Sequence, residues 1–109
     1  MRKEPILDGV PELLILRLLG REEMHGYRLV AEIRRRSNGK LNFGEGCIYP
    51  LLHRLVDQKY LTERRVSVGG RERCCYRLSA AGKKRLARLD QTWTQAVSAV
   101  NVCGEMCHA

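Results

Sequence analysis

The sequence predicts a mainly α (α+β) fold, with three helices followed by a two-stranded hairpin and a long final helix. Three observations support this order. Apolar residues recur every three or four positions in three early segments, as on one face of a helix. A Gly69-Gly70 pair separates two stretches rich in Val, Thr, Tyr and Leu, as in a hairpin. After Ser79 the helical spacing returns and continues almost to the end of the 109-residue chain, whose length suits one domain.

The first helix is expected over the run ELLILRLL, which directly follows Pro11. Proline suits the first turn of a helix because its missing N–H has no partner there, and Gly20 suits the C-terminal cap. The second helix is expected between Met24 and the pair Asn38-Gly39.

The second helix is expected to bury one apolar stripe, made of Tyr27, Val30 and Ile33. Gly26 lies on the same side. Because glycine has no side chain, this position predicts the close approach of another backbone segment.

The third helix is indicated by the stretch GEGCIYPLLHRL, residues 44–55. A proline costs about 3 kcal/mol inside a helix but little near its start, so Pro50 indicates that this helix begins around residues 44–46. The spacing predicts a buried stripe of Ile48, Leu51, Leu52 and Leu55. The residues expected to point outward are Tyr49, Pro50, His53, Arg54 and Asp57.

The hairpin is expected on both sides of Gly69-Gly70, with Arg71 projecting a positive charge from its tip. Alternation in the second strand places Cys74, Tyr76 and Leu78 on one face, and Arg73, Cys75 and Arg77 on the other. Ser79 is a suitable N-cap for the final helix, which is expected to reach about residues 100–102 with an early interruption at Gly82.

This order of elements is that of a winged helix-turn-helix, in which the third helix enters the DNA major groove and the hairpin tip contacts the flanking backbone. We therefore expect a winged helix-turn-helix DNA-binding domain in residues 1–78. Residues 79–109 are expected to form a C-terminal dimerisation helix and tail.

Four stretches resemble the PadR family of bacterial transcriptional regulators, in order and across residues 11 to about 89: LLILRLLG, MHGYRLVAEI, GEGCIYPLLHRLVDQKYL and GGRERCCYRLSAAGKKRL. In that family the helix with the Tyr-Pro step is the recognition helix, the wing has a Gly-Gly-Arg turn, and repression is usual. The resemblance implies DNA-facing roles for Tyr49, Pro50, His53 and Arg54, and phosphate contacts for Arg71 and Arg73. Departures from the family pattern occur at Val10, Cys47 and Cys74-Cys75.

Charge independently favours a polyanionic partner. Twenty Lys and Arg outnumber twelve Asp and Glu, for a net charge of +8, so double-stranded DNA is expected ahead of an anionic membrane surface. The sequence has neither an apolar run of about 18 residues nor the apolar run of a signal peptide, so a soluble, cytoplasmic protein without a membrane partner is expected. Five cysteines, an odd number, fit a reducing compartment.

The final helix carries an apolar seam that predicts a homodimer. A two-fold pair of such helices would place two recognition helices on half-sites about 34 Å apart, so the operator is expected to be an inverted repeat. The residues expected at the dimer contact are Leu86, Leu89, Trp93, Ala96, Val97 and Val100, with Cys103 and Cys107 continuing the spacing.

Trp93 also carries a ligand hypothesis, because a flat ring on this seam suits a small planar aromatic ligand that would relieve DNA binding. Certain multidrug-binding PadR-like proteins have a tryptophan in this helix that lines a cavity at the dimer interface. Plain dimer packing is the alternative role for Trp93.

Two other functions stay open at this stage. Cys103, Cys107 and His108, or Cys74-Cys75, suggest a metal- or thiol-sensing repressor, in which Cys75 between Arg73 and Arg77 is the reactive candidate. A winged helix used only as a protein-interaction adaptor is the second alternative. No enzyme, cofactor or metal site is predicted, since the three histidines are scattered, no Gly-rich phosphate loop occurs and no CxxC pair is present.

Overall fold

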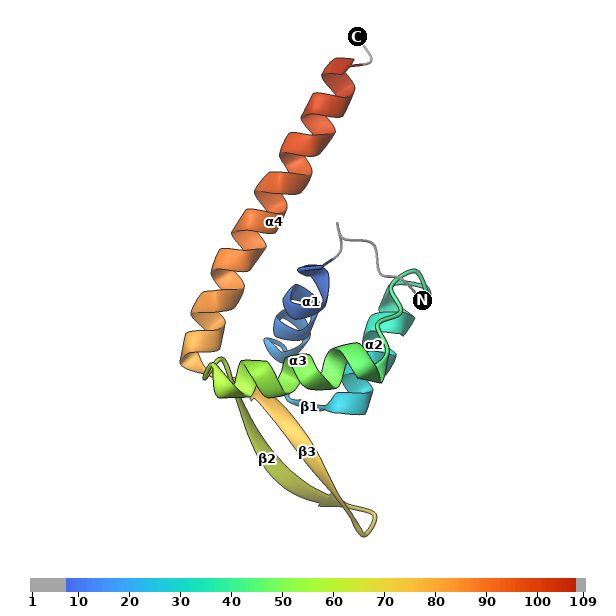
Figure 1. Cartoon of the computed structure of the whole chain (residues 1–109), viewed down its shortest axis with the longest axis vertical. Coiled ribbons are helices and arrows are strands. Elements are labelled where there is room, and N and C mark those ends of the chain that lie inside the picture. The colour runs from blue at the N-terminus through green and yellow to red at the C-terminus, as the bar shows by residue number, and fades with distance from the viewer. Residues whose placement is uncertain (1–7, 108–109) are drawn as a thin grey trace.

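The computed structural model describes residues 8–107, with the side chains of residues 106 and 107 left aside. Its helices and strands follow the expected order, with one short strand added (Figure 1). They are α1 (Val10–Leu19), β1 (Met24–His25), α2 (Gly26–Arg36), α3 (Glu45–Asp57), β2 (Leu61–Val68), β3 (Arg71–Leu78) and α4 (Ala80–Cys107). The predicted mainly α (α+β) fold class is confirmed.

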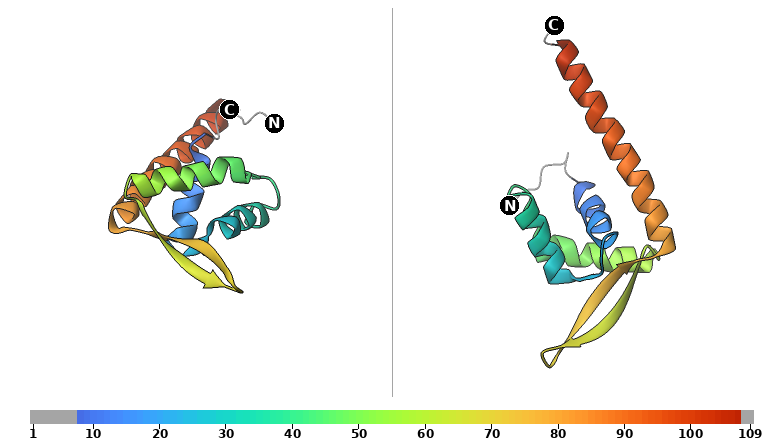
Figure 2. Two further views of the ribbon diagram at one scale, coloured as in Figure 1. Left: turned by 60° about the horizontal axis from the view of Figure 1, so that its bottom comes forward. Right: turned by 180° about the vertical axis from the view of Figure 1, so that it is seen from behind.

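The first three helices form one cluster, and the other two parts of the fold project from it in opposite directions (Figures 1 and 2). The β2–β3 hairpin points away from the cluster on one side. α4 begins at the base of this hairpin and extends the other way, which gives the molecule dimensions of 61 × 31 × 21 Å. The hairpin tip and the far end of α4 therefore lie at opposite ends of the molecule.

α3 is held against the cluster by the apolar stripe that the sequence predicts. Ile48, Leu52 and Leu55 are 0% exposed, whereas Leu51 is only half-buried. The helix begins at Glu45, within the predicted range, and includes Pro50. The stripe packs in a single core with buried residues of the other elements, among them Ile15, Leu16, Leu29, Leu61 and Tyr76.

The sequence missed β1. Met24 and His25 were expected to begin a helix, but they pair antiparallel with Tyr76 and Cys75, and α2 starts only at Gly26. β1 thus becomes the third strand of a sheet with the order β1-β3-β2. A strand of two residues has no period to detect, and its existence depends on the free edge of β3, which lies about 50 residues away in the sequence.

The predicted apolar stripe of α2 is wrong at its first residue. Tyr27 is 48% exposed, whereas Ile33 is buried as predicted and Val30 is half-buried. Leu29, which the predicted stripe did not include, is buried as well. Because α2 begins at Gly26, Tyr27 lies in its first turn, beyond the edge of the core. The spacing of Val30 and Ile33 alone does not show where the helix begins, so it could not show that Tyr27 lies outside the core.

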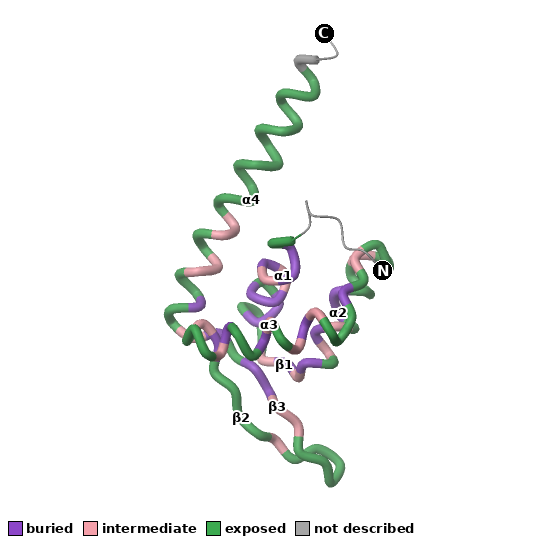
Figure 3. Tube along the Cα trace, in the orientation of Figure 1, coloured by how far each residue is buried: buried purple, intermediate pink, exposed green. Residues whose placement is uncertain are grey.

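α4 is longer than expected. It continues to Cys107, passing through Gly104, rather than ending near residues 100–102. Its N-terminal cap is confirmed, since the Ser79 hydroxyl accepts the Gly82 N–H at 3.0 Å and donates to the Lys59 carbonyl at 2.7 Å. Beyond Asp90 the helix is exposed on all sides of this single chain (Figure 3). No helix in the described part of the chain is long and apolar enough to cross a membrane.

Gly82 allows α4 to pack directly on the loop before β2. A Cβ at this position would lie 2.1 Å from the carbonyl oxygen of Tyr60 and 2.8 Å from a methyl group of Leu78. A backbone oxygen cannot rotate out of the way as a flexible side chain can. The early interruption noted in the sequence is therefore the place where the long helix approaches the domain most closely.

We expect Gly82→Ala to lower the free energy of unfolding by about 2–3 kcal/mol, because the added methyl group forces α4 away from Tyr60. Thermal unfolding followed by circular dichroism measures this, with a midpoint change of about 4–8 °C per kcal/mol. Gly46→Ala is the matched control, since a Cβ there meets nothing within 4 Å in a helix of the same protein. An equal effect of both substitutions would contradict the packing assigned to Gly82.

Candidate nucleic-acid interface

The outer face of α3 presents few but distinct side chains. Pro50, His53 and Asp57 are exposed, on the side opposite the buried stripe. A proline at this point has no backbone N–H to donate. The outward orientation expected for these residues is present, and their contact with DNA stays a prediction.

Arg54 is exposed as well, but it has a partner within the chain. Its Nη2 donates to Oε1 of Glu12 at 3.5 Å, and the other oxygen of Glu12 accepts from Nε of Arg85 at 2.8 Å. Glu12 therefore connects α1, the expected recognition helix α3 and the base of α4. To bind a phosphate, Arg54 has to leave a weak contact, which costs little on an exposed surface.

Tyr49 is half-buried rather than fully outward. Its ring lies on Gly26, where a Cβ would be 2.6 Å from Cε1 and 3.1 Å from the hydroxyl oxygen. The close approach predicted at Gly26 therefore exists, but the approaching group is a side chain of α3 and not a backbone segment. Burial raises the pKa of Tyr49, with a further increase from Glu45, so its hydroxyl remains a hydrogen-bond donor at neutral pH.

Arg73 and Tyr27 form a contact that the sequence analysis missed. The guanidinium carbon of Arg73, on β3, lies 4.6 Å from the centre of the Tyr27 ring. Arg73 is half-buried, so only part of its side chain projects as expected. The available signal was the position of Tyr27 next to Gly26, in the first turn of a helix, where an aromatic residue need not join the core.

The β2–β3 hairpin has the properties of a basic wing. Gly69 and Gly70 have positive φ angles of 56° and 79°, which close the turn and leave Arg71 exposed beside it. The strands of the hairpin carry five arginines and two glutamates: Arg64, Arg65, Arg71, Arg73 and Arg77, with Glu63 and Glu72. Two of the arginines are paired, Arg64 with Glu23 and Arg65 with Glu72. The tip therefore keeps an excess of positive charge.

The residues expected at the dimer seam divide into two groups along α4. Leu86 and Leu89 are half-buried and pack against the core of their own chain. Trp93 is 41% exposed and Val100 70% exposed, and Ala96 and Val97 are exposed too. The second group leaves most apolar surface uncovered, and its place in a dimer contact stays a prediction.

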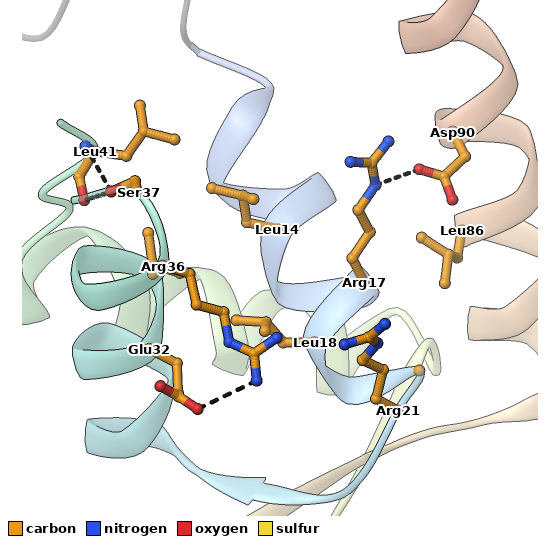
Figure 4. A pocket seen from close by; sticks show the side chains of 12 residues that line it. Leu14, Arg17, Leu18, Arg21, Glu32, Arg36, Ser37, Leu41, Leu86 and Asp90 are labelled. Carbon is orange, nitrogen blue, oxygen red and sulfur yellow. Dashed lines mark hydrogen bonds and ion pairs between the residues drawn. The ribbon is translucent and has the colours of Figure 1, made fainter. Parts of the chain in front are cut away.

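Two grooves lie beside α4, one near its base and one along its far half. The first, of about 570 Å³, lies between α1, α2 and α4, with Leu14, Leu18 and Leu86 among its apolar side chains (Figure 4). At its rim Arg17 pairs with Asp90, and Arg36 with Glu32. The second, of about 530 Å³, runs along α4, is lined by Trp93 and Val97, and shares Arg17 with the first. Trp93 thus borders open space and is not part of the core.

The sensing role considered for the cysteines stays a prediction. Burial raises the pKa of the Cys75 thiol, with Glu23 adding to the effect and Arg64 opposing it, so the thiolate expected at this residue is disfavoured. Among the described residues no cluster of three or more His, Cys, Asp and Glu has the arrangement of a metal site. Cys103 is exposed, whereas the side chain of Cys107 and all of His108 lie outside the described residues.

The sequence profile of the Transcriptional regulator PadR-like family matches residues 15–88, from the middle of α1 into the first turns of α4. The chain belongs to this family. The resemblance seen in the sequence is confirmed, and with it the expectation of a transcriptional regulator and not an enzyme.

Solved structures of PadR-like and related regulators have the same fold. A transcriptional regulator from Clostridium thermocellum has a TM-score of 0.83 at 21% identity, over 90% of this chain and 96% of that chain. A PadR-like transcriptional regulator from Bacillus cereus has a TM-score of 0.78 at 29% identity, over 90% and 94%. Bacillus subtilis PadR in complex with operator DNA has a TM-score of 0.68 at 28% identity, over 73% of this chain but only 46% of that chain.

We expect Gly26→Ala to reduce the free energy of unfolding of this PadR-like protein by about 1–3 kcal/mol, because the methyl group displaces the Tyr49 ring. Urea unfolding of the single and double variants tests the contact. In a Tyr49→Ala background the same substitution should cost nothing, since the ring is absent, whereas a Tyr49→Phe background should keep the full loss. An equal loss in all three backgrounds would mean that Tyr49 is not the group that requires glycine.

Proposed function

We propose that this PadR-like regulator binds an inverted-repeat operator as a homodimer and represses transcription from it. The observation that carries the proposal is the position of an exposed helix face beside an arginine-rich wing in the same domain. The complex of Bacillus subtilis PadR with operator DNA supports a DNA partner for this chain as well. Bound at an operator, such a dimer would exclude the transcription machinery from the promoter.

In this proposal α3 lies in the major groove, which is wide enough to admit a helix. His53 has ring nitrogens that can reach purine edges, and it is the residue we assign to base choice. Tyr49 can donate its hydroxyl to a phosphate from a fixed position, because its ring lies on Gly26. Pro50 contributes apolar contact, and Arg54 exchanges Glu12 for a phosphate.

The wing supplies affinity that does not depend on sequence. Arg71 at the tip reaches the phosphates that flank the groove occupied by α3. Each phosphate neutralised by an arginine or lysine releases counterions, so binding should weaken steeply as salt is added. The net charge of +8 agrees with this mode of binding.

The homodimer is supported by the far half of α4. The described residues of this part of the helix, 91–105, are all exposed in the single chain, and they include Trp93, Val97 and Val100. Two copies related by a two-fold axis would cover these side chains and place two α3 helices about 34 Å apart. In this arrangement residues 79–109 serve dimerisation, and residues 1–78 serve DNA binding.

Selection of bound duplexes from a random pool by the purified protein tests the proposal. We expect a two-fold symmetric motif with half-sites about one helical turn apart. A motif without symmetry would contradict the dimer on DNA. Indifference to duplex DNA would contradict the function and favour the protein-interaction adaptor.

Two substitutions separate affinity from base choice in this interface. Arg71→Ala should weaken binding to the selected operator and to random duplex by the same factor, about tenfold, and reduce the slope of log affinity against log salt by about one. His53→Ala should instead change which bases are selected. Fluorescence anisotropy titrations over a range of salt concentrations measure the first effect. Wild-type binding by both variants would show that these contacts are wrongly assigned.

A small planar aromatic ligand that relieves repression is a second hypothesis, favoured by the groove beside Trp93. Trp93 is the only tryptophan in the chain, so its fluorescence reports directly on this site. We expect planar dyes to quench this fluorescence and to weaken operator binding over the same range of dye concentration, because dye binding and DNA binding are then linked equilibria. If dyes change neither property, Trp93 serves dimer packing alone.

A further inference from the structure

Tyr27 occupies a position that packing alone does not explain. The residue is 48% exposed in the first turn of α2, yet the guanidinium carbon of Arg73 lies over its ring, 4.6 Å from the ring centre. The ring of His25 is parallel to that of Tyr27, with 5.7 Å between centroids and an angle of 4°. These contacts place an arginine and a tyrosine together between the helix-turn-helix and the wing.

The pair lies beside the expected recognition helix. Gly26, the neighbour of Tyr27, is the residue on which the Tyr49 ring of α3 lies. Arg73 is also close enough to Tyr49 to lower its pKa, against the larger effect of burial. The pair therefore lies between α3, which is expected in the major groove, and the tip of the hairpin, which is expected at the flanking phosphates.

A second arginine–tyrosine pair in the protein provides a comparison. At the base of α4 the Arg85 guanidinium lies 5.4 Å from the Tyr60 ring centre, and its Nε also donates to Glu12 at 2.8 Å. That arginine has both an aromatic and an anionic partner. Arg73 has the aromatic partner, but within residues 8–107 no carboxylate is paired with it.

The donors of the Tyr27–Arg73 pair are therefore available to an external anion. A guanidinium stacked on a ring keeps its N–H groups in its own plane, where they can donate to oxygen. The Tyr27 hydroxyl makes no hydrogen bond within the described part of the chain and can donate beside them. Stacking also restricts the arginine before binding, which lowers the entropy lost when it meets a ligand.

We propose that Tyr27 and Arg73 together bind one phosphodiester of the DNA backbone, between the groove that holds α3 and the stretch reached by the wing tip. This inference rests on the proposed function, and it adds Tyr27 to the interface and assigns Arg73 a fixed position. Phosphate oxygens are strong acceptors for both donors, and they carry no sequence information. The pair thus contributes affinity and register without contributing to base choice.

Three variants test the pair by anisotropy titration on the selected operator and on random duplex. Tyr27→Phe keeps the stacked ring and removes only the hydroxyl, and it should weaken binding to both duplexes by about five- to tenfold. Arg73→Ala should weaken both by about tenfold or more and reduce the salt slope by about one. Arg73→Lys keeps the charge but loses the planar fork, so we expect an intermediate loss. Unchanged thermal unfolding of Tyr27→Phe shows that the domain is intact.

Tyr60→Phe is the matched control, because it makes the same chemical change in the other arginine–tyrosine pair. It should bind both duplexes as the wild type does. An operator series with one neutral methylphosphonate at each position then locates the phosphate. For the wild-type protein, a methylphosphonate at one position in each half-site, outside the bases read by α3, should lower the affinity. The affinity of Arg73→Ala should not change when the same phosphate is replaced.

The outcomes distinguish this inference from the function on which it rests. If the wild type binds an inverted repeat and Arg71→Ala weakens it, while Tyr27→Phe and Arg73→Ala bind normally, the pair is structural and only the inference is wrong. If Tyr27→Phe changes base selection and not overall affinity, the phosphate assignment is wrong. If the wild type prefers no duplex, the proposed function and the inference are both wrong.

Discussion

The burial of one side of α3 is the constraint on which the rest of the structure depends. Ile48, Leu52 and Leu55 have no exposed surface, and they contact a core to which every other element except the far half of α4 contributes. Rotating the helix to present another face would expose three large side chains, at about 1.5–3 kcal/mol each. The opposite face, with Pro50 and His53, must therefore point to solvent. Tyr49 lies at the edge of this face, where the absence of a side chain at Gly26 leaves room for its ring.

The same core determines how the projecting helix relates to the DNA-binding unit. Gly82 brings α4 against the Tyr60 carbonyl, and Leu86 and Leu89 pack on the core from the first turns of α4. Exposed ion pairs such as Arg17–Asp90 contribute only about 0.2–1 kcal/mol each, so apolar packing and not charge sets the direction of α4. Glu12 nevertheless pairs with both Arg85 of α4 and Arg54 of α3. A change in the direction of α4 would therefore move Glu12 and alter the position of Arg54 on the surface expected to face DNA.

The parts of the fold that the sequence predicted are those with a local physical signal. The helical period located α1 and α3, the Gly69-Gly70 turn located the hairpin, and Ser79 marked the start of α4. β1 has two residues and no period, and its pairing with β3 is a long-range event. The far end of α4 was missed because a glycine is tolerated in an exposed helix at about 1 kcal/mol, so Gly104 does not end it. In the candidate site, exposure of His53 and Arg71 followed from spacing, whereas the partners of Arg54 and Arg73 come from residues about 40 positions away and have no local signature.

Photo-crosslinking from chosen positions to the selected operator tests most directly whether the exposed face of α3 meets the DNA. A benzoylphenylalanine would replace His53 on α3, Arg71 at the wing tip, or Ser98 on the far half of α4, all of which are exposed in the single chain. The account predicts crosslinks from position 53 to bases within each half-site, crosslinks from position 71 to the flanking backbone, and none from position 98. Crosslinks from position 98 in the absence of any from position 53 would place the DNA on another surface and contradict the account.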